Sequence, residues 1–319
     1  MTLTQLRALL MVLETGSFSA AALELGGAQS AVSYAVAELE RELGVRLLER
    51  GRFGARPTET GSRVAAHARQ LLGFEAAIHQ EAGVARGVLL GTLRIATFRS
   101  IASHVLPKAI AGLARRYPEL QVRLLEADGD DSERERLLLE GRAEVAFLQA
   151  PYPKYALTWD IIRDPYIALL PKDHPLAQST VSRADLLGSP LILYDNDDRC
   201  RLIVQRYLED APLPLRPATY SVREDSTIFS LVAQGLGVSV VPELAFRDLP
   251  DSVVRAPLIE PLERTLGVAI LPQSLKVPAV RVFLTTLREQ FPGSTLPELK
   301  TFLGSPPTFE SGAESVKNL

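Results

Sequence analysis

The chain has only one cysteine, Cys200, among its 319 residues. A single thiol cannot close a disulfide within the chain, and it cannot supply a zinc site that needs several thiolates. The disulfide-stabilised secreted class and the zinc-finger class are therefore excluded. A chain without disulfides suits a reducing compartment, so we expect this protein in the cytoplasm.

Long apolar runs are also absent. No uninterrupted apolar stretch reaches the roughly 20 residues that a membrane-spanning helix needs. The apolar segment near the amino end is preceded by no basic leader, which argues against a secretory signal. We expect no membrane partner.

Clusters of catalytic and metal-ligating residues are missing as well. The histidines are scattered and none has the spacing of a metal ligand: His67, His79, His104 and His174. Gly235 and Gly237 lack the third glycine of a dinucleotide-binding loop. We therefore expect no enzyme, no cofactor and no metal site.

A strong excess of one charge is missing overall, because the net charge is −3. The arginines are nevertheless unevenly placed, since the segment from Arg41 to Arg69 holds seven arginines and three glutamates. A local basic patch matters more for binding phosphate than the total charge does. This patch keeps nucleic acid among the candidate partners.

What is present begins with three helical segments and a short basic hairpin before Gly61. In the third segment, apolar residues recur at intervals of three and four from Val32 to Leu43, which predicts one buried helical stripe. The other face is uncharged until Glu38 and carries small or planar hydrogen-bonding side chains: Gln29, Ser30, Ser33 and Tyr34. An exposed face without charge is typical of a docking surface.

The first turns of this third segment fit a helix-turn-helix. Such a motif presents the start of its second helix to base edges in the major groove, where small hydrogen-bonding groups fit and carboxylates do not. Arginines of the following hairpin would hold the DNA backbone: Arg50, Arg52 and Arg56. An alanine-rich helix pair can also be a plain bundle element, but the basic hairpin favours double-stranded DNA as the partner.

A long helix is predicted next, over residues 58–85. Val64, Leu71 and Ile78 repeat every seven residues, which predicts a narrow coiled-coil seam. Phe74 lies between the last two. Such a stripe can also pack on its own domain, but this helix lies between two compact units, so we favour self-association. Glycines near its end predict a hinge: Gly83, Gly87 and Gly91.

The remainder of the chain alternates strand and helix patterns. The strand-like segments are 92–97, 121–127, 144–150, 166–171, 190–194, 218–222, 238–242 and 267–272. The helical segments are 106–118, 131–142, 202–211, 225–235 and 277–291. This alternation predicts βαβ units and mostly parallel sheets covered on both faces.

Residues 14–61, ETGSFSAAALELGGAQSAVSYAVAELERELGVRLLERGRFGARPTETG, resemble the N-terminal motif of the LysR-type transcriptional regulators. The likeness continues through LRIAT (93–97), KDHPLA (172–177) and LVAQGLGVSVVPE (231–243). The resemblance implies an N-terminal all-α winged helix-turn-helix, a long linker helix, and a C-terminal α/β effector domain of two Rossmann-like subdomains, similar to periplasmic binding proteins.

The resemblance also implies function and assembly. A small-molecule effector between the two subdomains would control operator binding or activation. The chain would form a homodimer through the linker helix and a homotetramer on DNA. Three positions depart from the family pattern: Gly27 replaces an apolar residue, Ala28 a capping serine and Ser30 a proline. Because a lost cap costs about 1 kcal/mol, we expect a loose start to the recognition helix and an atypical operator.

The expected division of the chain has four parts. They are a winged helix-turn-helix domain (1–61), a linker helix with hinge (58–90), an effector-binding α/β domain (91–295) and a flexible tail (296–319). Within the effector domain, subdomain I covers about 91–163 and 267–295, and subdomain II covers about 164–266.

Candidate effector contacts follow from the sheet. In open α/β sheets, ligands bind beyond the carboxyl ends of strands, next to helix N-termini. This rule, which agrees with the family's effector cleft, selects residues 97–103, Gln149, 194–200 and 225–227. The candidate contacts within them are Thr97, Arg99, Ser100, Gln149, Arg199, Cys200 and Thr227. Ser100 and Thr227 would donate hydroxyl hydrogen bonds, and arginines, Arg223 included, could hold a carboxylate.

The acidic run 195–198 points the other way, toward a cation or a solvated turn. We favour the turn, because the run lacks the glycine and the distant glutamate of a calcium loop.

Cys200 supports an alternative function. Peroxide-sensing members of the family carry a reactive cysteine at about this place, and Arg199, Arg201 and a helix N-terminus would lower a thiol's pKa. A second, resolving cysteine is absent, and Asp197 and Asp198 would raise the pKa again. We favour a passive cysteine and keep a single-cysteine oxidant sensor as the alternative.

Overall fold

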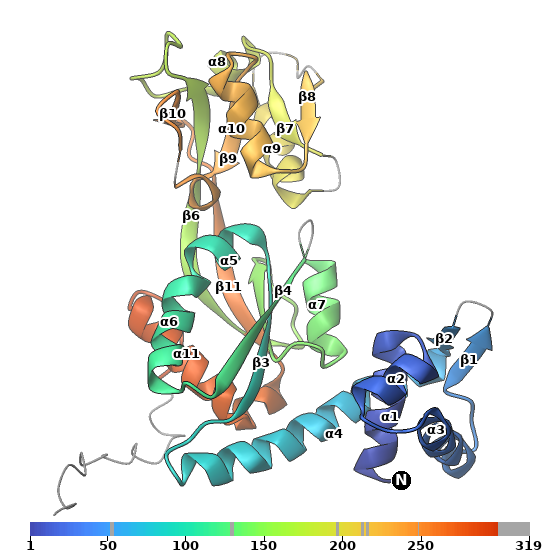
Figure 1. Cartoon of the computed structure of the whole chain (residues 1–319). Helices are drawn as coiled ribbons and strands as arrows, with labels where there is room; N and C mark the ends of the chain where they lie inside the picture. Colours follow the sequence, from blue (N-terminus) through green and yellow to red (C-terminus); the bar gives the residue numbers. More distant parts are fainter. Residues whose placement is uncertain are drawn as a thin grey trace, which may run out of the picture.

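The computed structural model describes residues 1–51, 54–127, 131–195, 198–211, 214, 217–247 and 249–298. Several predicted features lie outside the described residues: Arg52, the side chain of Arg50, Asn196 and Asp197 of the acidic run, and the tail from 299 onward. Figure 1 shows a helical N-terminal unit joined by one long helix to an α/β unit with two lobes.

The N-terminal unit is a cluster of three helices with a small antiparallel hairpin. Its elements are α1 (Leu3–Thr15), α2 (Phe18–Glu24), α3 (Gln29–Leu43), β1 (Leu48–Gly51) and β2 (Gly54–Pro57). The stripe predicted for α3 is buried, since Val32, Val36 and Leu39 are at most 5% exposed. These side chains pack against Leu9 of α1 and Ala21 of α2. The predicted helix-turn-helix is confirmed.

Side-chain caps decide where these helices begin. The Ser17 hydroxyl accepts a hydrogen bond from the N–H of Ala20 at the start of α2, and Thr2 caps α1. Ala28, before α3, has an extended backbone with φ −83° and ψ 144° and makes no side-chain cap hydrogen bond. The recognition-helix candidate therefore starts without the cap that helix N-termini normally have.

The long helix α4 (Glu59–Val84) leaves the N-terminal unit in close contact with the hairpin. Thr58 caps it, as predicted, by accepting a hydrogen bond from the N–H of Gly61 at 2.8 Å. A Cβ at Gly61 would lie 1.9 Å from the carbonyl oxygen of Leu47. Only glycine permits this approach, so the start of α4 is held close to Leu47, just before the β1–β2 hairpin (the wing).

Of the three glycines predicted to form a hinge, only Gly87 and Gly91 lie after the end of α4. Gly83 lies inside α4, where a Cβ would come 2.5 Å from the carbonyl oxygen of Val88. Gly87 and Gly91 have φ angles of 79° and 104°, a region that glycine adopts at little cost. The chain therefore turns sharply between α4 and the first strand of the α/β unit.

The α/β unit is built on a seven-stranded sheet with the order β10-β6-β11-β5-β3-β4, and β9 also pairs with β6. The strands are β3 (Gly91–Thr97), β4 (Leu120–Glu126), β5 (Val145–Gln149), β6 (Leu157–Pro171), β9 (Ser239–Pro242), β10 (Val253–Pro257) and β11 (Glu263–Ile270). The fifteen-residue β6 pairs with β11 along its first part and with β9 and β10 along its second. It therefore runs through both lobes (Figure 1).

Helices pack around both parts of the sheet. Lobe I, which we define as β3–β5 and the helices on them, contains α5 (Arg99–His104), α6 (Leu106–Arg116), α7 (Ser132–Leu139), η2 (Pro272–Lys276) and α11 (Pro278–Gln290). Lobe II contains α8 (Arg183–Leu187), β7 (Ile192–Tyr194), α9 (Arg199–Glu209), β8 (Tyr220–Val222), α10 (Asp225–Ala233), η1 (Glu243–Phe246), β9 and β10. In the core of lobe I, the rings of Phe147 and Phe283 meet edge-on with centroids 6.4 Å apart.

The expectation of mostly parallel sheets is wrong. Among the described strands of the large sheet, β3–β4 and β3–β5 are parallel, whereas β5–β11, β6–β11, β6–β10 and β6–β9 are antiparallel. The reason is that β6 and β11 cross between the lobes in opposite directions. The short strand β10 and the first half of β6 were not expected, because charged residues such as Asp160 and Arg163 interrupt the apolar pattern there.

No single helix among the described residues is long and apolar enough to cross a membrane. The pair α1 and α2 passes the same test of length and composition together, but these helices meet at 117°. Both contribute buried side chains to the N-terminal core.

Candidate functional site

The first two turns of α3 form an uncharged surface that faces solvent. Gln29 and Ser30 are exposed, Tyr34 is 69% exposed and Ser33 is half-buried. Ser19 of α2 donates a hydrogen bond to Gln29 Oε1 at 3.1 Å. The first turn holds no acidic residue. The structure places the four predicted side chains at the same end of one helix, and their contact with DNA stays a prediction.

The first acidic side chain of α3 is already paired. Glu38 lies 2.6 Å from Arg41, and this contact lowers the pKa of Glu38. Exposed pairs of this kind contribute little to stability. The pair does, however, offset the negative charge nearest to the exposed face.

The β1–β2 hairpin is held to α3 by a part-buried carboxylate. Glu40 Oε1 accepts a hydrogen bond from the N–H of Leu47 at 2.7 Å, just before β1. Arg56, on β2, is exposed. Arg50 lies on β1 with its side chain outside the described part, and Arg52 lies outside it altogether. Of the three predicted hairpin arginines, Arg56 is therefore the one whose side-chain exposure the structure describes.

A cleft lies between the two lobes, with about 500 Å³ of space open to solvent on one side. Its lining includes five of the seven predicted effector contacts: Arg99, Ser100, Gln149, Arg199 and Cys200. The other two do not line it. Thr97 is buried, with its hydroxyl 3.3 Å from the carbonyl oxygen of Phe98, and Thr227 is exposed on α10.

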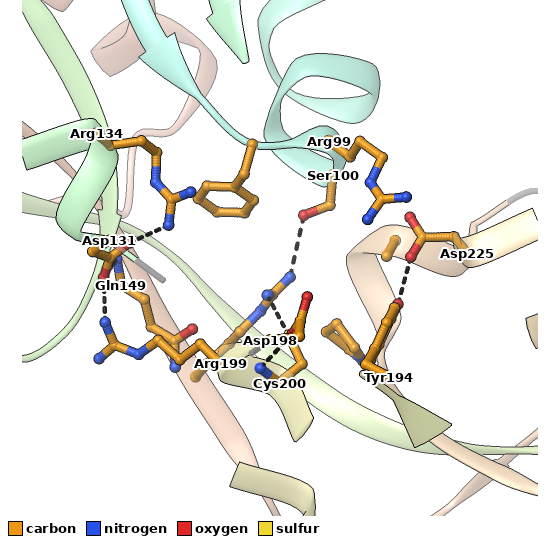
Figure 2. Close-up of a pocket in the computed structure, with 14 residues that line it drawn as sticks. Arg99, Ser100, Asp131, Arg134, Gln149, Tyr194, Asp198, Arg199, Cys200 and Asp225 are labelled. Carbon is orange, nitrogen blue, oxygen red and sulfur yellow. Dashed lines mark hydrogen bonds and ion pairs between the residues drawn. The ribbon is translucent and has the colours of Figure 1, made fainter. Parts of the chain in front are cut away.

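Asp131 joins the lobes at one side of the cleft. Its carboxylate pairs with Arg134 of α7 and with Arg199 of α9, as Figure 2 shows. It also accepts a hydrogen bond from the N–H of Gln149 at 3.1 Å. Arg199 donates a second bond, to the carbonyl oxygen of Ala150 at 2.9 Å. One carboxylate thus holds two arginines from different lobes.

Arg264 of β11 occupies the floor of the cleft. It is 6% exposed and pairs with Asp164 at 2.7 Å. It donates a hydrogen bond to the Ser100 hydroxyl at 3.2 Å and another to the Cys200 sulfur at 3.5 Å. Its guanidinium also lies 5.6 Å from the centre of the Phe98 ring. A single arginine therefore contacts residues from both lobes.

The opposite side of the cleft is bridged by Arg99. This residue of α5 pairs with Glu224, and it donates a hydrogen bond to the carbonyl oxygen of Arg223 at 2.9 Å. Nearby, the Tyr194 hydroxyl donates to the carboxylate of Asp225 (Figure 2). Two arginine bridges, one at each side, therefore hold the lobes together across the cleft.

Cys200 is the second residue of α9. Its own N–H donates to the Asp198 carboxylate at 2.7 Å. Burial, reinforced by Asp198 and opposed by Arg264, raises the pKa of Cys200 to about 11. Burial also raises the pKa of Asp198. At neutral pH the thiol is therefore protonated.

The acidic run is partly accounted for. Asp195 pairs with Arg223 at 3.0 Å, and Asp198 caps α9. Asn196 and Asp197 lie outside the described residues. Within the described ranges, no group of three histidine, cysteine, aspartate or glutamate side chains could hold a metal ion.

Four further lining residues lie in the segments selected from the sequence, although they were not among the named contacts: Phe98, Tyr194, Asp198 and Asp225. The other lining residues were not predicted: Asp131, Arg134, Pro242, Ala245 and Arg264. Asp131 carries a local signal, since it begins a predicted helical segment. Arg264 carries none, because its place depends on the antiparallel return of β11 through the sheet.

The chain matches two family models. The model described as "LysR substrate binding domain" matches residues 86–292, and the model described as "Bacterial regulatory helix-turn-helix protein, lysR family" matches residues 3–62.

Relatives that cover most of this chain agree with these matches. A probable HTH-type transcriptional regulator, LrrA of Synechococcus elongatus, is 45% identical over 92% of this chain and 98% of its own length. A probable hydrogen peroxide-inducible genes activator of Mycobacterium avium is 31% identical over 76% of this chain and 78% of its own. A full-length OxyR structure from Pseudomonas aeruginosa superposes with a TM-score of 0.73 at 26% identity, covering 90% of this chain and 95% of that one.

Proposed function

The chain belongs to the LysR family of bacterial transcriptional regulators, and from this premise we propose that it binds a double-stranded DNA operator through α3 and the wing. It is a regulator and not an enzyme. We further propose that a small-molecule effector in the cleft between the lobes controls operator binding or activation. The protein would act in the cytoplasm as a homodimer through α4 and as a homotetramer on DNA.

The observation that carries the DNA-binding proposal is the exposed, uncharged start of α3. Gln29, Ser30 and Tyr34 face solvent, and Glu38 is paired with Arg41. Glutamine can pair with adenine, and hydroxyl groups can reach bases or phosphates. Exposed Arg56 on the wing supplies a phosphate contact that would set position rather than sequence.

The experiment is a selection from a random-sequence duplex library, followed by binding measurements with Ser33→Glu. A carboxylate at this place would face base edges and phosphates, so we expect operator binding to fall at least a hundredfold while the fold is retained. Affinity of the unaltered protein should also fall steeply with salt, because bound phosphates release counterions.

Ser179→Glu is the matched control, because Ser179 is exposed in lobe II. It adds the same charge far from α3 and should bind the selected duplex normally. Full binding by Ser33→Glu would mean that another surface reads the DNA.

The effector proposal rests on the residues that converge on the cleft. Arg199 and Arg99 bridge the lobes from opposite sides, and Ser100 lies beside Arg264 at the floor. A ligand that competes for these groups would change the angle between the lobes. The change would reach α3 through α4. It would alter the spacing between the two recognition helices of a dimer, whose DNA half-sites lie about 34–36 Å apart.

A thermal-shift screen of small metabolites on the full chain tests this proposal. For any compound that raises the melting temperature, Ser100→Ala should reduce the shift by more than half, because it removes a hydroxyl from the lining. Thr227→Ala is the matched control, since Thr227 does not line the cleft. Equal loss in both variants would contradict the assigned place of the ligand.

A second candidate is a single-cysteine oxidant sensor. The observations in its favour are the likeness to a probable hydrogen peroxide-inducible genes activator and to OxyR, together with Cys200 beside Arg264 in the cleft. The raised pKa of Cys200 opposes it, because the thiolate is the reactive form. We therefore prefer a bound effector as the signal.

A further inference from the structure

A second cavity lies where α4 meets lobe I. It holds about 440 Å³ of space, is open on one side and shares no lining residue with the cleft between the lobes. Figure 1 shows α4 running along the base of lobe I. Apolar side chains from three parts of the chain form much of the wall: Phe74, Leu138, Leu271 and Val277.

Arg69 of α4 lines this cavity, and it forms no direct ion pair with a carboxylate among the described residues. Its Nη1 donates to the main-chain carbonyl oxygen of Glu140 at 3.3 Å. Its Nε is buried and has no hydrogen-bond partner among the described residues. The Glu140 carboxylate pairs with Arg136 instead, at 3.1 Å. Burial lowers the pKa of Arg69 more than the nearby Glu140 and Glu14 carboxylates raise it, because removing a charged group from water is costly.

The other charged groups of the lining satisfy each other. Arg94 pairs with Glu144, and Glu144 also accepts a hydrogen bond from the N–H of Arg94 at 2.7 Å. Two arginines and one glutamate line the cavity, so the remaining positive charge is that of Arg69. An anion would complete the site, and the apolar wall would bury a hydrocarbon body.

Two glycines shape the space beside Arg69. At Gly141, with φ +66°, a Cβ would lie 3.2 Å from the Cβ of Arg69. Glycine there lets α4 approach the end of α7. At Gly73, a Cβ would meet no atom within 4 Å, so the missing side chain leaves room inside the cavity.

We propose that this cavity binds a small amphipathic organic anion, with its carboxylate on Arg69 and its apolar body against Phe74 and Leu271. The site is separate from the cleft of the proposed effector. Its occupant would touch α4 and lobe I at once, so it would stiffen the joint between the DNA-binding unit and the effector domain.

The test uses 4-fluorobenzoate as the probe and fluorine NMR titration of the full-length protein. We expect saturable binding that Arg69→Met weakens at least tenfold, because hydrogen bonds to charged groups are among the strongest polar contacts. Ser100→Ala, in the other cleft, should leave this binding unchanged. The uncharged 4-fluorobenzamide should bind at least tenfold more weakly than the acid.

Gly73→Leu gives an independent check, because it fills the cavity and leaves Arg69 in place. It should abolish the saturable binding without changing the oligomeric state or lowering the melting temperature. The proposal would be overturned if the unaltered protein showed no saturable binding. It would also be overturned if a carboxylate of a second copy of the chain occupied Arg69. Equal affinity in Arg69→Met and the unaltered protein would overturn it too.

Discussion

The Cys200 thiol shows how opposing charges act on one residue of the cleft. Arg264, whose Nη1 lies 3.5 Å from the sulfur, favours the thiolate, whereas burial and Asp198 favour the thiol. Burial is the largest effect, and the pKa of Cys200 rises to about 11. The sequence suggested an activating helix N-terminus with flanking arginines, but Arg199 turns away to Asp131.

We expect alkylation of Cys200 by iodoacetamide to be slow at neutral pH, with a rate that is half-maximal near pH 11. With this pKa, about one thiol in a thousand is ionised at pH 8. The same cysteine in the urea-unfolded chain should titrate near 9.0, its ordinary value. Mass spectrometry of the Cys200 peptide gives the rate.

The sign of the stability effect follows from the same shift. The folded chain holds the thiol proton more tightly, so this contribution to the free energy of unfolding is complete below about pH 9 and is lost as the pH rises through about 11. A folded-state midpoint below pH 8 would contradict the buried thiol and favour the oxidant-sensing alternative.

At the scale of elements, α3 has a start that its sequence leaves weak. Ala28 already has the extended backbone of a cap residue but no side-chain oxygen. The N–H of Ala31, the third helical residue, bonds only to the Ala28 carbonyl oxygen at 3.0 Å among the described contacts. A hydroxyl on residue 28 could accept from that N–H without a change in backbone.

Ala28→Thr should therefore stabilise the N-terminal unit by about 1 kcal/mol, within the range of about 0.5–2 for cap residues. Hydrogen exchange of the α3 amides measures this local effect. Ala28→Val is the matched control, because it has the same shape as threonine and lacks the oxygen. Equal stabilisation by valine would attribute the gain to packing.

The sequence predicts elements of this kind better than it predicts the cleft. The stripe of α3 depends on residues three and four apart, so its buried face could be inferred before the structure. The cleft contacts join distant segments: Arg199 meets Asp131 across 68 positions, and Arg264 meets Asp164 across 100. Local patterns carry no record of such pairings.

Thr227 shows a second limit of the sequence argument. The rule for helix N-termini locates free N–H groups and not side chains, and on α10 the Thr227 side chain faces solvent instead of the cleft. The first half of β6 was missed for a related reason. It carries charged residues where it passes between the lobes, so its pattern is not that of a buried strand.

At the scale of the whole molecule, α4 leaves an apolar face without a partner in the described chain. Leu71 and Ile78 are 43% and 69% exposed, whereas Phe74, 38% exposed, also lines the cavity next to lobe I. Val64, which was predicted to lie in the seam, packs with Ala65 and Ala68 against the N-terminal core instead. At the other end, Gln80 accepts a hydrogen bond from the N–H of Ala279. Both ends of α4 are thus fixed within the chain while the seam between them stays open, as self-association requires.

Ile78→Glu should weaken this association without unfolding the chain. Burying an isoleucine side chain contributes about 1.5–3 kcal/mol, so we expect the dimer dissociation constant to rise at least tenfold, measured by sedimentation velocity over a range of protein concentrations. Ala76 is exposed on a different face of α4, and Ala76→Glu adds the same charge away from the seam, so it should leave the dimer intact. If both variants dissociate alike, general charge repulsion is the cause; if neither does, the seam lies outside the dimer interface.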